Sequence, residues 1–160
     1  MTNDILDLAA KVGRALEAKG LVLATAESCT GGGVAQAVTE IAGSTGWFEC
    51  GFVTYSNASK AEMLDVSAAL IAQFGSVSEE VAAAMAEGAL ANSVADVTIS
   101  TTGIAGPSGA VPGKPVGTVC FGWARGDTTH TERLVFAGDR KAVREQTVAH
   151  ALQGLLRFIE

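Results

Sequence analysis

The sequence predicts an α/β protein, a single three-layer domain in which helices flank a mixed sheet. Short apolar runs such as 21–26 and 94–102 are typical of strands that are buried on both faces. Between them lie longer stretches whose apolar residues recur at helical spacing. The chain has 160 residues, the size of one domain, and neither a repeat nor a linker divides it. Residues 1–160 are therefore expected to fold together.

Residues that cap helices or form turns separate the predicted elements. The helices are expected over 4–20 after the cap Asp4, over 34–41, from Ser56 or Asn57 through Lys60 to Leu64, after Ser67, from Ser78 to about Asn92, and after Asp139. The strands are expected over 21–26, 51–55 and 94–102, and as a hairpin of 116–124 with 131–136 across residues 125–127.

Composition and charge exclude several classes of protein. A hydrophobic fraction of 48% with 18% charged residues does not fit a disordered chain or a coiled coil. The net charge of -6 argues against nucleic acid as a partner, although not against a small anionic ligand. The first 20 residues are amphipathic and interrupted by charge, so no signal peptide or membrane span is expected.

The cysteines and histidines indicate a reducing compartment and no metal site. Cys29, Cys50 and Cys120 cannot all pair and none belongs to a CxxC motif, so a cytoplasmic location is expected. The chain's histidines, His130 and His150, offer no zinc-like spacing. We expect neither a metal nor another cofactor.

Glycines gather in two segments, 31–51 and 103–126, which hold 13 of the 19 in the chain. Glycine weakens a fold unless the backbone needs a positive φ or must approach something closely, so this clustering indicates a site. The glycines match neither a Walker A loop, which needs a following Lys, nor the GxGxxG pattern of dinucleotide-binding proteins.

The segment 25–32 is the strongest candidate for chemistry. A predicted strand delivers Ser28 to a glycine-rich turn, and a helix starts directly after it. Unpaired backbone N–H groups at such a turn can hold a phosphate or an oxyanion. Spacing alone favours a plainer interpretation, in which Ser28 or Thr30 only caps the helix. The neighbouring Cys29 is expected to pack rather than to react.

The segment 55–60 again lies where a strand gives way to a helix. A serine nucleophile needs a base, and a buried Lys60 with a lowered pKa could serve, with Tyr55 donating or relaying a proton. The plainer alternative places Lys60 in solvent and Tyr55 in the core.

Two further segments are candidates for ligand contacts. The glycine-rich stretch 101–117, which contains Lys114, can form a backbone cradle or a lid, or simply a mobile loop. Arg140 and Arg144 lie four residues apart, so they share one face of the predicted helix. They are expected either to bind an anion or an acidic partner surface, or simply to form a solvated face.

The motifs TAESCTGG, GFVTYSNASK, STTGIAGPSG, KPVGTV and GDRKAVR, in this order, resemble those of the CinA C-terminal domain family. The resemblance covers nearly the whole chain. It implies hydrolysis of the carboxamide of nicotinamide mononucleotide to nicotinate mononucleotide and ammonia, a salvage step in NAD metabolism. It also implies that Ser28 is the nucleophile, Lys60 the base and Tyr55 the supporting hydroxyl.

The partner expected from these observations is a small pyridine nucleotide, and the apolar composition makes a homo-oligomer plausible. The residues expected to bind the substrate are Thr30, Gly31, Gly32, Asn57, Gly103, Ile104, Ala105, Gly106 and Arg140. A pyridine-nucleotide-binding or regulatory domain without turnover is the alternative. A phosphoester hydrolase would require a metal site that these residues do not offer.

Overall fold

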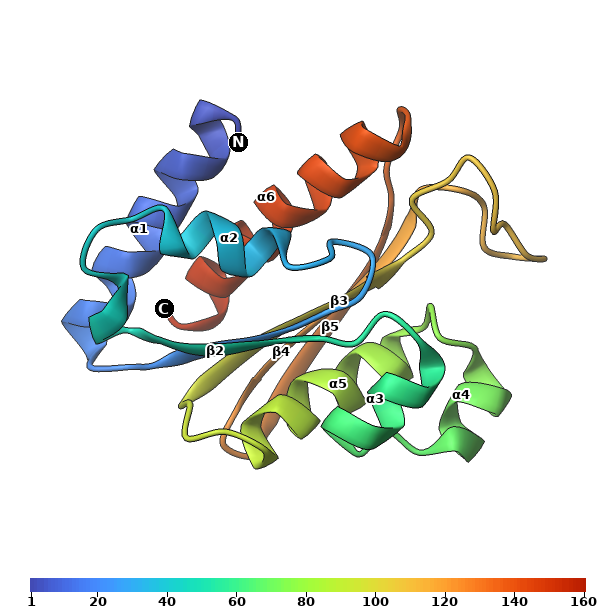
Figure 1. The fold of residues 1–160 in the computed structure, drawn as a ribbon, viewed down its shortest axis with the longest axis horizontal. Coiled ribbons are helices and arrows are strands. Elements are labelled where there is room, and N and C mark those ends of the chain that lie inside the picture. Colours follow the sequence, from blue (N-terminus) through green and yellow to red (C-terminus); the bar gives the residue numbers. More distant parts are fainter.

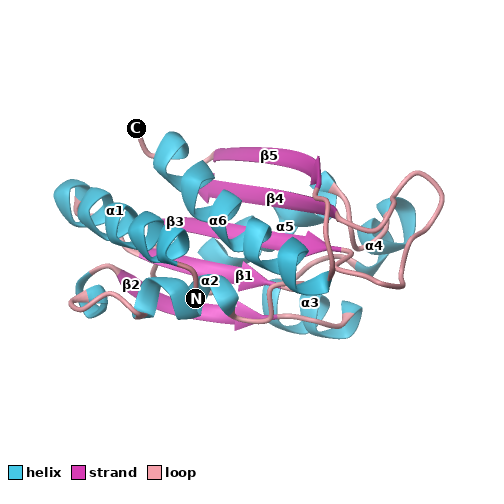
Figure 2. Ribbon diagram, turned by 90° about the horizontal axis from the view of Figure 1, so that it is seen from above, coloured by secondary structure: helices cyan, strands magenta, loops and turns pink.

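The computed structural model describes residues 1–160 and has the predicted α/β architecture. One five-stranded sheet has the strand order β2-β1-β3-β4-β5 (Figure 2). Its first three strands run parallel, whereas β4 pairs antiparallel with both β3 and β5, so the sheet is mixed as predicted. The strand bounds are Leu23–Glu27 for β1, Phe48–Val53 for β2, Val97–Gly103 for β3, Thr118–Arg125 for β4 and Thr128–Val135 for β5.

Helices cover both faces of this sheet and complete the three layers (Figure 1). One face carries α1 (Asn3–Lys19), α2 (Gly33–Thr39) and α6 (Arg140–Phe158). The other face carries α3 (Asn57–Leu64), α4 (Ala68–Phe74) and α5 (Glu79–Ala91). A 3-10 turn, Ser44–Gly46, precedes β2. None of the helices combines the length and the apolar character needed to cross a membrane.

Apolar side chains pack in two clusters. The larger has 23 buried residues drawn from α1, α2, α6 and the sheet. The smaller has 6 and lies mainly between β1, α3 and α5. Because both faces of the sheet are covered, β1, β3 and β4 are buried almost throughout, which explains their nearly continuous burial pattern.

Local capping chemistry sets most of the helix starts. Ser56, Ser67, Ser78 and Asp139 each accept a hydrogen bond from a backbone N–H in the first turn of the helix that follows. The first helix is capped by Thr2 and not by the predicted Asp4. Asp4 lies inside the first turn instead, where its negative charge complements the helix dipole.

The second strand also differs from its prediction over 51–55. It spans Phe48–Val53 and alternates between half-buried and exposed residues, because β2 is an edge strand. The start of such a strand is not a continuous apolar run, so the apolar pattern of the sequence does not indicate it. Residues 54–56 consequently form the loop that leads into α3.

The parallel strands place three loops at one edge of the sheet. β1, β2 and β3 end at Glu27, Val53 and Gly103, and their carboxyl ends lie side by side because the strands are parallel neighbours. Ligands of open α/β sheets bind at this edge. The segments after β1, β2 and β3 are three of the four that the sequence singled out.

The tight packing between α6 and β4 predicts how a substitution at Gly154 changes the free energy of unfolding. An added Cβ at Gly154 would overlap the indole of Trp123, which is fully buried and stacked on Phe121 with ring centroids 5.7 Å apart. Ala is favoured over Gly in a helix by about 1 kcal/mol, but overpacking costs about 1–3 kcal/mol. We expect Gly154→Ala to lower the free energy of unfolding by up to about 2 kcal/mol in urea denaturation. Gln153→Ala, at an exposed neighbouring position, is the control, and a more stable Gly154→Ala protein would contradict this packing.

Candidate active site

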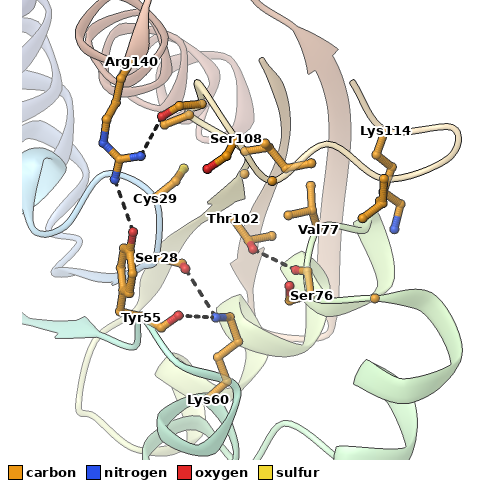
Figure 3. Close-up of a pocket in the computed structure, with 17 residues that line it drawn as sticks. Ser28, Cys29, Tyr55, Lys60, Ser76, Val77, Thr102, Ser108, Lys114 and Arg140 are labelled. Carbon is orange, nitrogen blue, oxygen red and sulfur yellow. Dashed lines mark hydrogen bonds between the residues drawn. The ribbon is translucent and has the colours of Figure 1, made fainter. Parts of the chain in front are cut away.

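A cavity of about 430 Å³ opens at the carboxyl ends of the parallel strands and is lined by 17 residues (Figure 3). Among them are eight residues that the sequence predicted: Ser28, Tyr55, Lys60, Gly103, Ile104, Ala105, Gly106 and Arg140. They come from the loops after β1, β2 and β3, from α3 and from the start of α6. The sheet topology therefore brings together segments that are far apart in the sequence.

Ser28 occupies the first position after β1 and is held there by its backbone. Its N–H donates to the carbonyl of Thr101 in β3 over 2.9 Å, and its own carbonyl accepts from the N–H of Gly31 over 3.0 Å. Only 8% of the residue is exposed. The hydroxyl of Ser28 lies 3.3 Å from the Nζ of Lys60 (Figure 3).

The turn after Ser28 is built around the buried carboxylate of Glu27. This carboxylate accepts hydrogen bonds from the hydroxyl of Thr30 over 2.5 Å and from the N–H groups of Val34 and Ala35 over 2.8 and 3.0 Å. Thr30 also shares a hydrogen bond with the hydroxyl of Thr101 over 2.8 Å. Glu27 thus takes up N–H groups at the start of α2 that the sequence analysis left free for a ligand.

The capping alternative for this segment is wrong. The N-cap position of α2 is Gly32, and neither Ser28 nor Thr30 caps the helix with its side chain. The Glu27 carboxylate satisfies the helix N–H groups instead, which leaves the Ser28 hydroxyl free to face the cavity.

Lys60 points from α3 into the protein and is only 1% exposed, so the solvated alternative is wrong as well. Its Nζ contacts the Ser28 hydroxyl and donates to the carbonyls of Thr54 and Tyr55, each over 3.1 Å. Burial lowers the pKa of Lys60 from its ordinary value of 10.5, because desolvation disfavours the ammonium ion. A neutral amine has two N–H donors and one lone pair, which match two carbonyls and one hydroxyl.

Tyr55 is 62% exposed, which overturns the alternative that places it in the core. Its hydroxyl accepts a hydrogen bond from Arg140 over 3.2 Å, and the same guanidinium donates to the Gly106 carbonyl over 2.9 Å (Figure 3). Arg144, one turn along α6, donates to the carbonyls of Cys29 and Thr30 over 3.1 and 3.3 Å. The two arginines therefore brace loops of the cavity, while both residues remain exposed to solvent on the surface of α6.

Cys29 lines the cavity beside Ser28 but is poorly suited to act as a nucleophile. The residue is 5% exposed, and burial, followed by the nearby charge of Glu27, raises the pKa of its thiol to about 12. The reactive form of cysteine is the thiolate, which this environment disfavours. Cys29 belongs to the larger apolar cluster, which confirms the expectation that it packs. That it does not react stays a prediction.

Four of the residues expected to bind substrate lie outside the cavity lining: Thr30, Gly31, Gly32 and Asn57. Thr30 is buried among Glu27 and Thr101, and Asn57 is the exposed first residue of α3. The lining includes nine residues that were not predicted to bind: Cys29, Gly75, Ser76, Val77, Thr102, Ser108, Gly109, Val111 and Lys114.

Some of these additional residues had a signal in the sequence. Ser108 and Lys114 belong to the glycine-rich segment 101–117, which was marked as a cradle or lid. Residues 75–77 had none, because they form an ordinary connection between α4 and α5 that tertiary packing brings to the cavity. No three His, Cys, Asp or Glu side chains gather closely enough to hold a metal ion.

The ionisable lining of the cavity includes three basic side chains, Lys60, Lys114 and Arg140, and no acidic one. This lining contrasts with the chain as a whole, whose net charge is -6. The local field therefore favours an anionic ligand.

The fold and the cavity together define a class of single-domain α/β proteins with a cationic, hydroxyl-rich cavity at the carboxyl ends of parallel strands. Residues 5–159 match the CinA C-terminal domain family, and the chain belongs to that family. This confirms the resemblance seen in the sequence motifs.

Relatives of known name and structure match over nearly the full length. The chain is 50% identical over 156 residues to nicotinamide-nucleotide amidohydrolase PncC of Pseudomonas putida, with 98% of both chains covered. It is 53% identical over 155 residues to the protein of the same name from Escherichia coli K12, covering 96% of this chain and 93% of the relative. The crystal structure of competence/damage inducible protein CihA from Agrobacterium tumefaciens superposes with a TM-score of 0.97 at 39% identity, covering 100% of this chain and 98% of that one.

The role of Glu27 in shaping the turn can be tested by Glu27→Gln. The amide keeps one acceptor oxygen but places an NH2 group where the carboxylate accepts a second hydrogen bond. A lost hydrogen bond to a buried charged group costs about 1.5–3 kcal/mol, so the free energy of unfolding should fall by that amount. Urea denaturation measures this effect, with the exposed Glu40→Gln as control. Equal stability of the two variants would show that Glu27 does not hold the turn.

Proposed function

We propose that the protein hydrolyses the carboxamide of nicotinamide mononucleotide to nicotinate mononucleotide and ammonia, with Ser28 as nucleophile and Lys60 as base. One observation carries the mechanism: the buried Nζ of Lys60 lies 3.3 Å from the Ser28 hydroxyl. The choice of substrate is supported by the amidohydrolase relatives, which match at about half identity over nearly the whole chain. The cationic lining of the cavity suits the phosphate of a nucleotide.

Acylation follows from the contacts of Lys60. The neutral amine takes the proton of the Ser28 hydroxyl while the oxygen attacks the carboxamide carbon and forms a tetrahedral oxyanion. As this intermediate collapses, the carbon–nitrogen bond breaks, and the Lys60 ammonium gives its proton to the departing NH2 group, which leaves as ammonia. An ester between Ser28 and the nicotinoyl group remains.

Deacylation uses the same groups in reverse order. Lys60 takes a proton from water, the resulting hydroxide attacks the ester carbon, and nicotinate mononucleotide leaves as Ser28 regains its proton. The two carbonyls of Thr54 and Tyr55 hold the Nζ of Lys60 in place through both steps.

The oxyanion needs hydrogen-bond donors during both steps. The Tyr55 hydroxyl accepts from Arg140, so its own proton is free to be donated to the oxyanion or relayed. Among the backbone N–H groups that follow the nucleophile, that of Gly31 is bonded to the Ser28 carbonyl, whereas that of Cys29, which lines the cavity, donates to no other residue. The N–H of Cys29 and the hydroxyl of Tyr55 are the candidate donors.

Ser28→Ala removes the nucleophile and should lower the rate of ammonia release from nicotinamide mononucleotide by about three orders of magnitude or more. A coupled ammonia assay measures the rate, and Ser44→Ala, outside the cavity, should retain full activity. Full activity of Ser28→Ala would refute the serine mechanism. Binding of the mononucleotide by calorimetry, with no ammonia from the wild-type protein, would favour a domain that binds without turnover.

The lowered pKa of Lys60 predicts the pH dependence. The base must be neutral in the free enzyme, so kcat/KM should rise with pH and level off, with an inflection below 10.5. Lys60→Arg keeps a positive charge at every accessible pH and should be inactive throughout the range. A rate that stays constant into the acid range, or an active Lys60→Arg protein, would exclude Lys60 as the base.

A further inference from the structure

We infer that Lys114, with the hydroxyl of Ser76, binds the phosphate of the nucleotide and gives the enzyme its preference for nucleotides over nucleosides. This inference rests on the proposed function, because it assigns one end of the substrate within the same cavity. It moves the phosphate away from Arg140, where the sequence analysis had placed a substrate contact.

The three basic side chains of the cavity differ in how many hydrogen bonds they already make within the protein. Lys60 is committed to Ser28 and to two backbone carbonyls at the reacting end. Arg140 donates to the Gly106 carbonyl and to the Tyr55 hydroxyl. Lys114 makes one hydrogen bond, from its Nζ to the carbonyl of Phe74 over 2.6 Å. An ammonium group has three donors, so Lys114 keeps two for a ligand.

A hydroxyl near Lys114 is also free. Ser76 lines the cavity next to Gly75, where an added Cβ would lie 3.0 Å from the Nζ of Lys114, and the Ser76 hydroxyl has no hydrogen-bond partner within the protein. The backbone at Ser76 is nevertheless fixed, because its carbonyl accepts from the hydroxyl of Thr102 at the end of β3 over 2.7 Å. A lysine with a neighbouring hydroxyl supplies hydrogen bonds, charge-assisted at the lysine, that phosphate oxygens accept.

The geometry separates the two ends of the cavity. Figure 3 shows Lys114 on the side away from Tyr55 and Arg140, with Thr102 and Val77 between. A nucleotide whose carboxamide carbon meets Ser28 can therefore extend its phosphate toward Lys114. Contacts between Lys114 and the phosphate would stabilise the enzyme–substrate complex without involving the reacting atoms.

The loop that carries Lys114 is anchored before any ligand binds. The backbone N–H and carbonyl of Lys114 are both hydrogen-bonded to Val111, over 2.9 and 3.1 Å. The guanidinium of Arg133, in β5, donates to the carbonyl of Gly113. A preorganised cation loses less conformational entropy when it binds a ligand, which strengthens the interaction.

The experiment compares kcat/KM for nicotinamide mononucleotide with kcat/KM for its dephosphorylated nucleoside. Lys114→Gln should lower the value for the nucleotide about 10- to 100-fold, mainly through KM, since the lost contact involves charged groups. The value for the nucleoside should stay within about twofold. Lys114→Arg keeps the charge and should retain the preference for the nucleotide.

Two further variants make the comparison specific. Arg140→Gln should lower both values by a similar factor, because Arg140 positions Tyr55 and the Gly106 carbonyl. Lys141→Gln, whose side chain is 84% exposed and paired with Glu145, should change neither. Inorganic phosphate should compete with the nucleotide in the wild-type protein and compete less well in Lys114→Gln.

The outcomes distinguish this inference from the proposed function. A Lys114→Gln protein that loses the same factor on both substrates, or an Arg140→Gln protein that loses only the nucleotide, overturns the assignment of the phosphate. If the wild-type protein releases no ammonia, the proposed function fails, and calorimetry with the mononucleotide still tests Lys114. Equal affinity of the wild-type and Lys114→Gln proteins in that titration also overturns the assignment.

Discussion

The buried carboxylate of Glu27 is the interaction on which the rest of the site depends. It lies at the last position of β1, one residue before Ser28, and it binds the first turn of α2 through two backbone N–H groups. A buried charge is costly unless hydrogen bonds satisfy it, and here a hydroxyl and two N–H groups do so. The direction in which the chain leaves β1, and with it the position of the Ser28 hydroxyl, follows from this arrangement.

Lys60 adds a second buried ionisable group that faces a different part of the same turn. Two carbonyls accept its N–H groups, so the amine is held without a carboxylate partner. An adjacent carboxylate would favour the ammonium ion, whereas carbonyl acceptors in a desolvated position allow a lower pKa. Burial thus increases the share of the neutral amine at a given pH, and the neutral amine is the form that the proposed mechanism requires.

Local signals in the sequence were enough for most of the fold. Caps such as Ser78 and Asp139 act on their own helices, and the continuous apolar runs of buried strands reflect two covered faces. Local sequence patterns gave the wrong bounds where an element's extent depends on which other elements pack against it. Strand β2 begins earlier than predicted because an edge strand is only half covered, a property of its place in the sheet.

The same distinction applies to the site. Sequence motifs led to Ser28, Tyr55 and Lys60, which the structure brings into one cavity. They could not show that the polar residue before Ser28 would take the helix N–H groups, since a single Glu has no distinguishing pattern. Residues 75–77 reach the cavity through the packing of α4 and α5, and nothing in their own sequence indicates it.

Helix α6 holds the loops after β1 and β2 in place, which bears on the order in which the parts of the cavity form during synthesis and folding. Arg144 reaches back 115 and 114 residues to Cys29 and Thr30, and Arg140 reaches back 85 residues to Tyr55. These contacts come from the final helix of the domain, so the residues near the start of the chain are synthesised long before their braces. A nascent chain that ends before α6 can contain both Ser28 and Lys60 and still lack the contacts that hold the surrounding loops. The contacts that hold the loops of the cavity are therefore complete only after the last helix has docked.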